Sequence, residues 1–167
     1  MSPAPDGSGH DGVSVRLAGS GDRDLLLAWA NDPSTRAASF NPAPIDPATH
    51  EAWFARRLSM TDGRIWIGVV DGRPIGQVRV DRDSNGRGEV SISVAEEERG
   101  RGFARKLLLA GMAAAGRELG VTTLVALIRP ENTRSLALFR KVGFRKEAMG
   151  ERNGIPCWIM VREGEPD

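Results

Sequence analysis

The segment Val94-Ala-Glu-Glu-Glu-Arg-Gly-Arg-Gly-Phe-Ala-Arg105 decides how this chain is organised. An apolar alternation typical of a strand ends at Val94, an acidic loop follows, and a glycine-rich turn opens a helical pattern. Free N–H groups at a helix N-terminus bind anions, and glycine lets an anion approach the backbone. We therefore predict that a phosphate-bearing ligand binds this turn. The alternative is an ordinary helix start whose glycines only shape the chain.

The chain after this turn is predicted to form a helix, a strand, a second helix and two further strands. Apolar residues recur at steps of three or four and predict a helix over residues 102–119, which Gly120 ends. A β-branched, apolar run predicts a buried strand over residues 122–128. Asn132 can cap a helix that continues to Lys141. Two final strands are expected over residues 144–149 and 156–161.

The chain before the turn predicts an antiparallel sheet preceded by two helices. Asp71-Gly72 and Asn85-Gly86 separate apolar alternations, which is the strongest short hairpin signal, so residues 65–94 should form a meander. A further strand is expected over residues 13–17. We predict a helix to about Ala30, capped by Ser20 or Asp22, a loop over residues 33–46, and a helix from the Asp46 N-cap to Leu58 with Trp53, Phe54 and Leu58 as its apolar face.

Composition limits the classes of function. The 167 residues fit one domain, and 23 basic against 22 acidic residues give a net charge of +1, which argues against a nucleic-acid partner. One cysteine and two histidines argue against a disulfide framework or a metal site. No apolar run approaches 18 residues, so we expect no membrane span. Residues 1–12 and 164–167 are expected to be tails, the first disordered and not a signal peptide, and the protein is expected to be cytoplasmic.

Two motifs resemble the GNAT superfamily of N-acetyltransferases. Arg99-x-x-Gly102-x-Ala104 is similar to the family signature R/Q-x-x-G-x-G/A, whose loop holds the pyrophosphate of acetyl-CoA. The segment from Asn132 to Phe144 is similar to the family's N-x-x-S/A-x-x-x-Y-x-x-x-G-F segment. The resemblance covers roughly residues 13–161 and implies a single-domain α/β fold over residues 13–163. That fold has a mixed sheet of about seven strands, splayed between the fourth and fifth, and about four helices.

The resemblance also implies a cosubstrate and its site. Acetyl-CoA would lie in the slot between the two splayed strands, and the acceptor amine would attack its thioester directly, without a metal. Backbone groups of one strand would hold the pantetheine and polarise the thioester carbonyl. The residues implied for the cosubstrate are Ile92, Ser93, Val94, Arg99, Gly100, Arg101, Gly102, Phe103, Ala104, Arg105, Asn132, Ser135 and Phe139.

The acid and base of the family are missing or displaced. Phe139 stands where many relatives have the tyrosine that protonates the departing thiolate, and the chain contains no tyrosine. Leu127 stands where some peptide-acetylating relatives have a glutamate. Glu89, acting through water, is the candidate base, against a merely structural carboxylate, and His50 and Asp81 are lesser candidates. We expect Cys157 to be a buried strand residue.

The acceptor is expected to be a small-molecule amine. Residues 29–40 and 50–54 resemble acetyltransferases of nucleotide-linked amino sugars, such as the pseudaminic-acid pathway enzyme. The missing acid and base also fit an amine less basic than lysine. The alternatives are a ribosomal-protein or peptide N-terminal acetyltransferase, an enzyme for an antibiotic or biosynthetic amine, and a CoA-binding module without catalysis. We expect a monomer or homodimer, with acceptor contacts from Trp29, Arg36, Ser39, His50, Trp53 and Asp81.

Overall fold

The computed structural model describes residues 12–164. The predicted tails lie outside these residues, except for Gly12 and Gly164. The elements are, in chain order, β1 (Ser14–Leu17), the short 3-10 helix η1 (Ser20–Asp22), α1 (Arg23–Ala30), α2 (Pro33–Ala38), α3 (Pro47–Ser59), β2 (Gly63–Val70), β3 (Arg73–Arg82), β4 (Arg87–Val94), the 3-10 helix η2 (Glu96–Glu98), α4 (Phe103–Leu119), β5 (Thr123–Ile128), α5 (Thr133–Lys141), β6 (Arg145–Arg152) and β7 (Ile155–Glu163).

One mixed sheet of seven strands has the order β1-β2-β3-β4-β5-β7-β6. The predicted meander is confirmed, because β2, β3 and β4 pair antiparallel. Asp71 and Gly72 both have positive φ, 49° and 75°, as the predicted tight hairpin turn requires. Only β4 and β5 pair in parallel, and their register covers just Arg87 to Glu89 against Thr123 to Val125.

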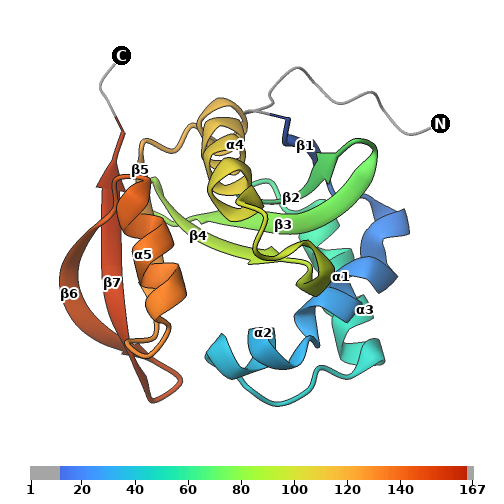
Figure 1. The fold of residues 1–167 in the computed structure, drawn as a ribbon, viewed down its shortest axis with the longest axis horizontal. Coiled ribbons are helices and arrows are strands. Elements are labelled where there is room, and N and C mark those ends of the chain that lie inside the picture. Colours follow the sequence, from blue (N-terminus) through green and yellow to red (C-terminus); the bar gives the residue numbers. More distant parts are fainter. Residues whose placement is uncertain (1–11, 165–167) are drawn as a thin grey trace.

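The parallel pair opens after these three residues. Within the described part of the chain, the register pairs no residue of β4 beyond Glu89 with β5, although β5 stays paired with β7 to Ile128. The predicted splay between the fourth and fifth strands is therefore confirmed. Figure 1 shows the two strands diverging, with α4 and α5 on one side of the opening.

Two apolar clusters lie on opposite faces of the sheet. Alternation along each strand sends one set of side chains to each face. The larger cluster packs α4 and α5 against the sheet, and Gly111 of α4 lies so close to Val78 that a Cβ there would approach a methyl group to 2.3 Å. The smaller cluster joins α1 and α3 to β2 through Leu26, Phe54 and Ile67.

The first third of the chain differs from the prediction in three places. Residues 33–38 form α2, not a loop, because Asp32 caps it by accepting from the Thr35 N–H at 3.0 Å and Pro33 opens its first turn. Asp22 precedes α1 but does not cap it with its side chain, since its carboxylate bonds Arg16 at 2.8 and 2.9 Å. Leu58 is 44% exposed and is not part of the apolar face of α3.

None of the helices within residues 12–164 is both long enough and apolar enough to cross a bilayer.

Candidate active site

The glycine-rich turn has the conformation that the sequence predicts. Gly100 and Gly102 have φ values of 78° and 79°, and Gly102 directly precedes the 17-residue helix α4. A Cβ at either glycine would meet no atom within 4 Å, so the space beside the backbone is open. The first N–H groups of α4 have no partner within the helix. A turn of this geometry can receive an anion.

The arginines of the turn are placed differently from one another. Arg99 is tied to other parts of the protein: it donates to the carbonyl of Val94 at 3.0 Å, to Ser34 Oγ at 2.8 Å and to Asp32 Oδ2 at 3.0 Å. Hydrogen bonds from Ser34 and then Arg99 hold the pKa of Asp32 well below its usual range. Arg101 lies 3.5 Å from Glu98, and Arg105 is exposed. The structure thus leaves Arg105 and most of Arg101 accessible for a phosphate.

Helix α2 spans the open end of the splay. Arg99, which follows β4, bonds the N-terminal end of α2 at Asp32 and Ser34. Arg129, which follows β5, donates to the carbonyls of Ala37 and Ser39, at 2.9 and 3.1 Å, at the C-terminal end. Two arginines, one after each of the diverging strands, therefore hold the two ends of the short helix α2.

The slot residues are partly accessible, except for Phe139. Ile92 and Val94 pack toward the larger core, and Ser93 accepts a hydrogen bond from Gln77 at 3.1 Å on the other face. Asn132 caps α5 by accepting from the N–H of Ser135 at 3.3 Å. Phe139 is 1% exposed, and its ring packs edge-on against Phe144 with centroids 4.9 Å apart. The ring of Phe139 is thus a core side chain in this structure.

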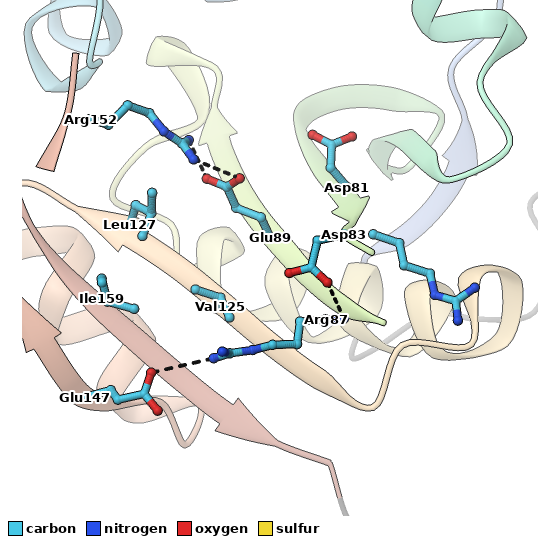
Figure 2. A pocket seen from close by; sticks show the side chains of 10 residues that line it. Asp81, Asp83, Arg87, Glu89, Val125, Leu127, Glu147, Arg152 and Ile159 are labelled. Atoms are coloured by element: carbon cyan, nitrogen blue, oxygen red, sulfur yellow. Dashed lines mark hydrogen bonds and ion pairs between the residues drawn. The ribbon is translucent and has the colours of Figure 1, made fainter. Parts of the chain in front are cut away.

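A cavity of about 370 Å³ lies on the opposite face of the sheet from α4. Its apolar wall comes from Val125 and Leu127, which alternate with core residues along β5, and from Ile159 of β7. Figure 2 shows these apolar side chains beside several charged side chains. The charged lining residues are Asp81, Arg82, Asp83, Arg87, Glu89, Glu147 and Arg152.

Three of the four carboxylates that line this cavity have guanidinium partners, and Asp83 accepts from the backbone N–H groups of Asn85 and Arg87 instead. Glu89 accepts two bonds from Arg152, at 2.5 and 3.2 Å. Glu147 lies 3.6 Å from Arg87, and Asp81 bonds Arg57 and lies 3.5 Å from Arg79. Four carboxylates and three guanidinium groups line the cavity, so its charge is mixed and close to balanced.

Comparisons with known proteins agree with this geometry. The model of an acetyltransferase (GNAT) domain matches residues 13–145. This chain belongs to the GNAT family of acetyltransferases.

Two curated GNAT relatives are L-methionine sulfoximine/L-methionine sulfone acetyltransferases, from Pseudomonas paraeruginosa and Pseudomonas aeruginosa. Each is 31% identical over 138 residues, which cover 79% of this chain and 80% of the relative.

Solved structures show the same GNAT fold. The spermidine N-acetyltransferase from Vibrio cholerae in complex with CoA and spermine has a TM-score of 0.81 at 18% identity, over 92% of this chain and 96% of that one. The aminoglycoside acetyltransferase AAC(6')-Ib in complex with ribostamycin and coenzyme A also has a TM-score of 0.81, at 20% identity, over 92% and 94% of the two chains. The predicted α/β acetyltransferase fold is confirmed.

Of the six predicted acceptor residues, all of which lie in the described part of this GNAT chain, only Asp81 lines the cavity, beside the candidate base Glu89. Asp81 and Glu89 are opposite each other in the β3–β4 register, and both line the cavity. Trp29, by contrast, is 9% exposed in the smaller core. Arg36 donates to the carbonyls of Ala30 and Asn41, both at 2.6 Å, so it fixes the chain around α2.

Two further predicted acceptor residues, Ser39 and Trp53, also have structural partners. Ser39 Oγ accepts from the N–H of Asn41 at 3.2 Å. The ring of Trp53 lies 5.8 and 5.7 Å from the guanidinium carbons of Arg57 and Arg79, an arrangement that favours cation–π contact. The structure assigns these side chains to packing around the α1–α3 region.

His50, a predicted acceptor contact and lesser base candidate, is buried in this structure. Its side chain is only 3% exposed, and its ring centroid lies 5.5 Å from that of Trp53 and 6.1 Å from that of Phe54. Burial lowers the pKa of His50, with Arg23 adding to the effect and Asp24 opposing it. His50 is not among the residues that line the 370 Å³ cavity. Cys157 is 1% exposed, as predicted, and burial raises the pKa of its thiol.

Proposed function

We propose that this GNAT enzyme transfers the acetyl group of acetyl-CoA to the amine of a small acceptor that also carries a negative charge, of the amino-acid type. The observation that carries the proposal is the mixed-charge cavity beside Glu89, at the point where β4 separates from β5. The glycine turn lies at the end of the same strand, so one diverging strand connects a site for the cosubstrate with a site for the acceptor.

The residues present fit acetyl-CoA. The open space beside Gly100 and Gly102 and the free N–H groups of α4 suit the pyrophosphate, with charge from Arg101 and Arg105. β5 has left the edge of β4 beyond Glu89, and we assign the free backbone groups of Ile92 and Val94 on that edge, with Ser93 between them, to the pantetheine. Asn132 and Ser135 lie at the start of α5, which follows β5, and we assign them to the same arm of CoA.

The reaction uses a carboxylate base but no acid from the protein. The neutral amine attacks the thioester carbonyl carbon, the C–S bond breaks, and the backbone N–H groups of β4 stabilise the negative charge that develops on the carbonyl oxygen. The amine proton passes through water to Glu89. The CoA thiolate leaves unassisted and takes its proton from solvent, because Phe139 has none to give and thiol pKa values lie only near about 8.5.

The charge balance of the cavity supports an amino-acid acceptor. A polycation such as a polyamine is attracted by a surplus of negative charge, but here Glu89, Glu147 and Asp81 each have an arginine partner. A zwitterionic acceptor needs both a negative group for its amine and a positive group for its carboxylate. The two curated relatives act, by their names, on methionine sulfoximine and methionine sulfone, which are amino acids. The α-amine of an amino acid also has a lower pKa than the side chain of lysine, at about 10.4, and so needs a weaker base.

The amino-sugar acceptor stays a prediction from the sequence. Its supposed ring and phosphate contacts, Trp29 and Arg36, are buried or bonded to backbone carbonyls in this structure. The same cavity would have to bind an amino sugar through other residues.

An acceptor panel tests the proposal. The purified protein is mixed with acetyl-CoA and, in turn, L-methionine sulfone, spermidine, an aminoglycoside, an amino sugar and a lysine peptide, and release of the CoA thiol is followed. We expect the fastest release with the amino acid. Faster release with spermidine or the aminoglycoside would overturn the amino-acid assignment. CoA binding without thiol release from any amine would identify a non-catalytic module.

A further inference from the structure

The ion pair between Glu89 and Arg152 crosses the acceptor cavity. Glu89 lies on β4 and Arg152 at the end of β6, which is three strands away in the order β4-β5-β7-β6. At ~4.8 Å between strands, the two backbones would be roughly 14 Å apart on a flat sheet. The pair therefore reaches over β5 and β7, the strands that carry the apolar wall of Val125, Leu127 and Ile159 (Figure 2).

Arg152 is held in this position from several sides. It directly precedes the tight turn of Asn153 and Gly154, whose φ values are 51° and 76°. The side-chain amide of Asn153 donates to the carbonyl of Phe40 at 3.3 Å, and the guanidinium carbon of Arg152 lies 5.9 Å from the ring centroid of Phe40. The loop between α2 and α3 thus supports the guanidinium beside the cavity.

We propose that Arg152 is a specificity-determining residue that binds the carboxylate of the acceptor. This inference rests on the proposed function. On binding, the acceptor exchanges partners with the ion pair: its amine takes a place at Glu89, and its carboxylate replaces that of Glu89 on the guanidinium. The two planar groups match, because a guanidinium donates two parallel hydrogen bonds to a carboxylate. The side chain of the acceptor then lies along Val125, Leu127 and Ile159.

The exchange distinguishes zwitterions from simple amines. An amine without a carboxylate that approaches Glu89 would remove the partner of Arg152 and leave its guanidinium to water, which is a small penalty because the Arg152 side chain is 44% exposed. An amino acid supplies a new partner in the same step. Specificity thus comes from a penalty on the wrong acceptor as well as from attraction to the right one.

The other arginines near the cavity are less suited to this role. Arg87 lies toward Glu147, where β4 and β5 are still paired and the slot has not opened. Arg57 bonds Asp81 and is 8% exposed, and Arg79 lies beside the same carboxylate. Only Arg152, among the arginines that line the cavity, bonds Glu89, the last β4 residue before the splay.

The test compares two acceptors on matched variants. L-Methionine sulfone and its carboxamide, which has the same amine and no negative charge, are acetylated by the wild type, Arg152→Gln and Arg152→Lys. We expect Arg152→Gln to raise KM for the acid by about 10- to 100-fold, the range for a hydrogen bond to a charged group, with kcat little changed. For the carboxamide, kcat/KM should not fall and should rise by at most about threefold, because Arg152→Gln removes the small penalty of leaving a half-exposed guanidinium without a carboxylate. Arg152→Lys should restore part of the affinity for the acid.

Arg87→Gln is the control, since it removes the same charge from the same cavity. It should keep the preference for the acid over the carboxamide. Melting temperature and CoA affinity, measured on every variant, show that each is folded. An equal loss for both acceptors in Arg152→Gln, or the same selective loss in Arg87→Gln, would overturn the assignment of Arg152. Equal wild-type rates with acid and carboxamide would overturn it as well and leave the acetyltransferase intact, whereas no thiol release with either acceptor would instead reject the proposed function.

Discussion

The glycine turn lies beyond the end of β4, at the start of α4, whereas the acceptor cavity lies on the face of the sheet opposite α4. The two sites are built in opposite ways. The turn is a stretch of consecutive residues, Gly100 to Phe103, and we assign its backbone to the cosubstrate. The cavity takes its residues from five strands and the loop between β3 and β4, and it depends on side chains such as Glu89 and Arg152. A single substitution can therefore affect one site and leave the other unchanged.

This separation is expected from the physical origin of each site. Backbone N–H groups at a helix start are positioned as soon as the helix forms, whatever side chains surround them. Arg152 and Glu89 meet only when β6 and β7 have packed beside β5. This difference is why we assign the turn to the cosubstrate, which a whole family shares, and the cavity to the acceptor, which differs between the named relatives.

Gly102→Asp should have the largest effect, and only on the turn. Aspartate places a carboxylate beside the first N–H groups of α4, where it occupies the anion site and repels a pyrophosphate. We expect CoA affinity, measured by calorimetry, to fall by about 100-fold or more, which corresponds to the loss of roughly two hydrogen bonds to a charged group.

Gly102→Asn is the matched control for the backbone. Both residues tolerate the left-handed conformation at φ 79° about equally, and asparagine carries no charge. A loss as large in Gly102→Asn as in Gly102→Asp would show that backbone strain, not charge, is responsible. Unchanged CoA affinity in both variants would move the cosubstrate away from this turn.

Glu89→Gln tests the cavity in the same way and should leave CoA binding within about twofold. A general base contributes typically about 10²–10⁴-fold, so we expect kcat/KM to fall by roughly 100-fold below pH 7. The loss should shrink as the pH rises past the pKa of the acceptor amine, because the amine then arrives neutral. A loss below about 10-fold at every pH is the size of a lost hydrogen bond and would make Glu89 a binding residue only.

The sequence predicts the turn and most of the fold because those signals are local. Gly102 and Gly120 bound α4 as expected, and every predicted strand is present within a few residues. The family resemblance added the splay between β4 and β5, which composition alone does not show. The acceptor contacts could not be predicted in this way. Trp29 and Arg36 are plausible ligands in the sequence, but in the structure Trp29 is buried and Arg36 bonds backbone carbonyls.

The sequence analysis did not predict the position of Arg152 or helix α2, although a sequence motif indicates the first. Asn153-Gly154 is the same kind of hairpin dipeptide as Asp71-Gly72 and Asn85-Gly86. It places Arg152 at the turn between β6 and β7. The direction in which Arg152 reaches depends on the curvature of the sheet. Helix α2 was missed because three prolines in residues 33–46 suggested a loop, and its anchors Arg99 and Arg129 are distant in sequence.

His50 belongs to neither site, and it provides the smallest expected effect. Because burial, together with Arg23, lowers its pKa in the folded state below the ordinary 6.5, the unfolded chain binds a proton that the folded chain does not. The stability that neutral His50 maintains is therefore present above pH 6.5 and is lost as the pH falls from 6.5 through the folded pKa. His50→Phe removes this proton uptake and keeps an aromatic ring against Trp53 and Phe54.

We expect the melting temperature of the wild type to fall more than that of His50→Phe between pH 7.5 and 5.5, by a few degrees at most, since about 1 kcal/mol shifts it by roughly 2–4 °C in a chain of this size. The comparison uses the difference in slope, so a constant effect of the larger ring cancels. Steady-state kcat at pH 7.5 should be unchanged, because His50 does not line the cavity. Parallel melting curves would mean that the folded protein accepts the proton at His50 freely, and a large loss of kcat would return His50 to the acceptor site.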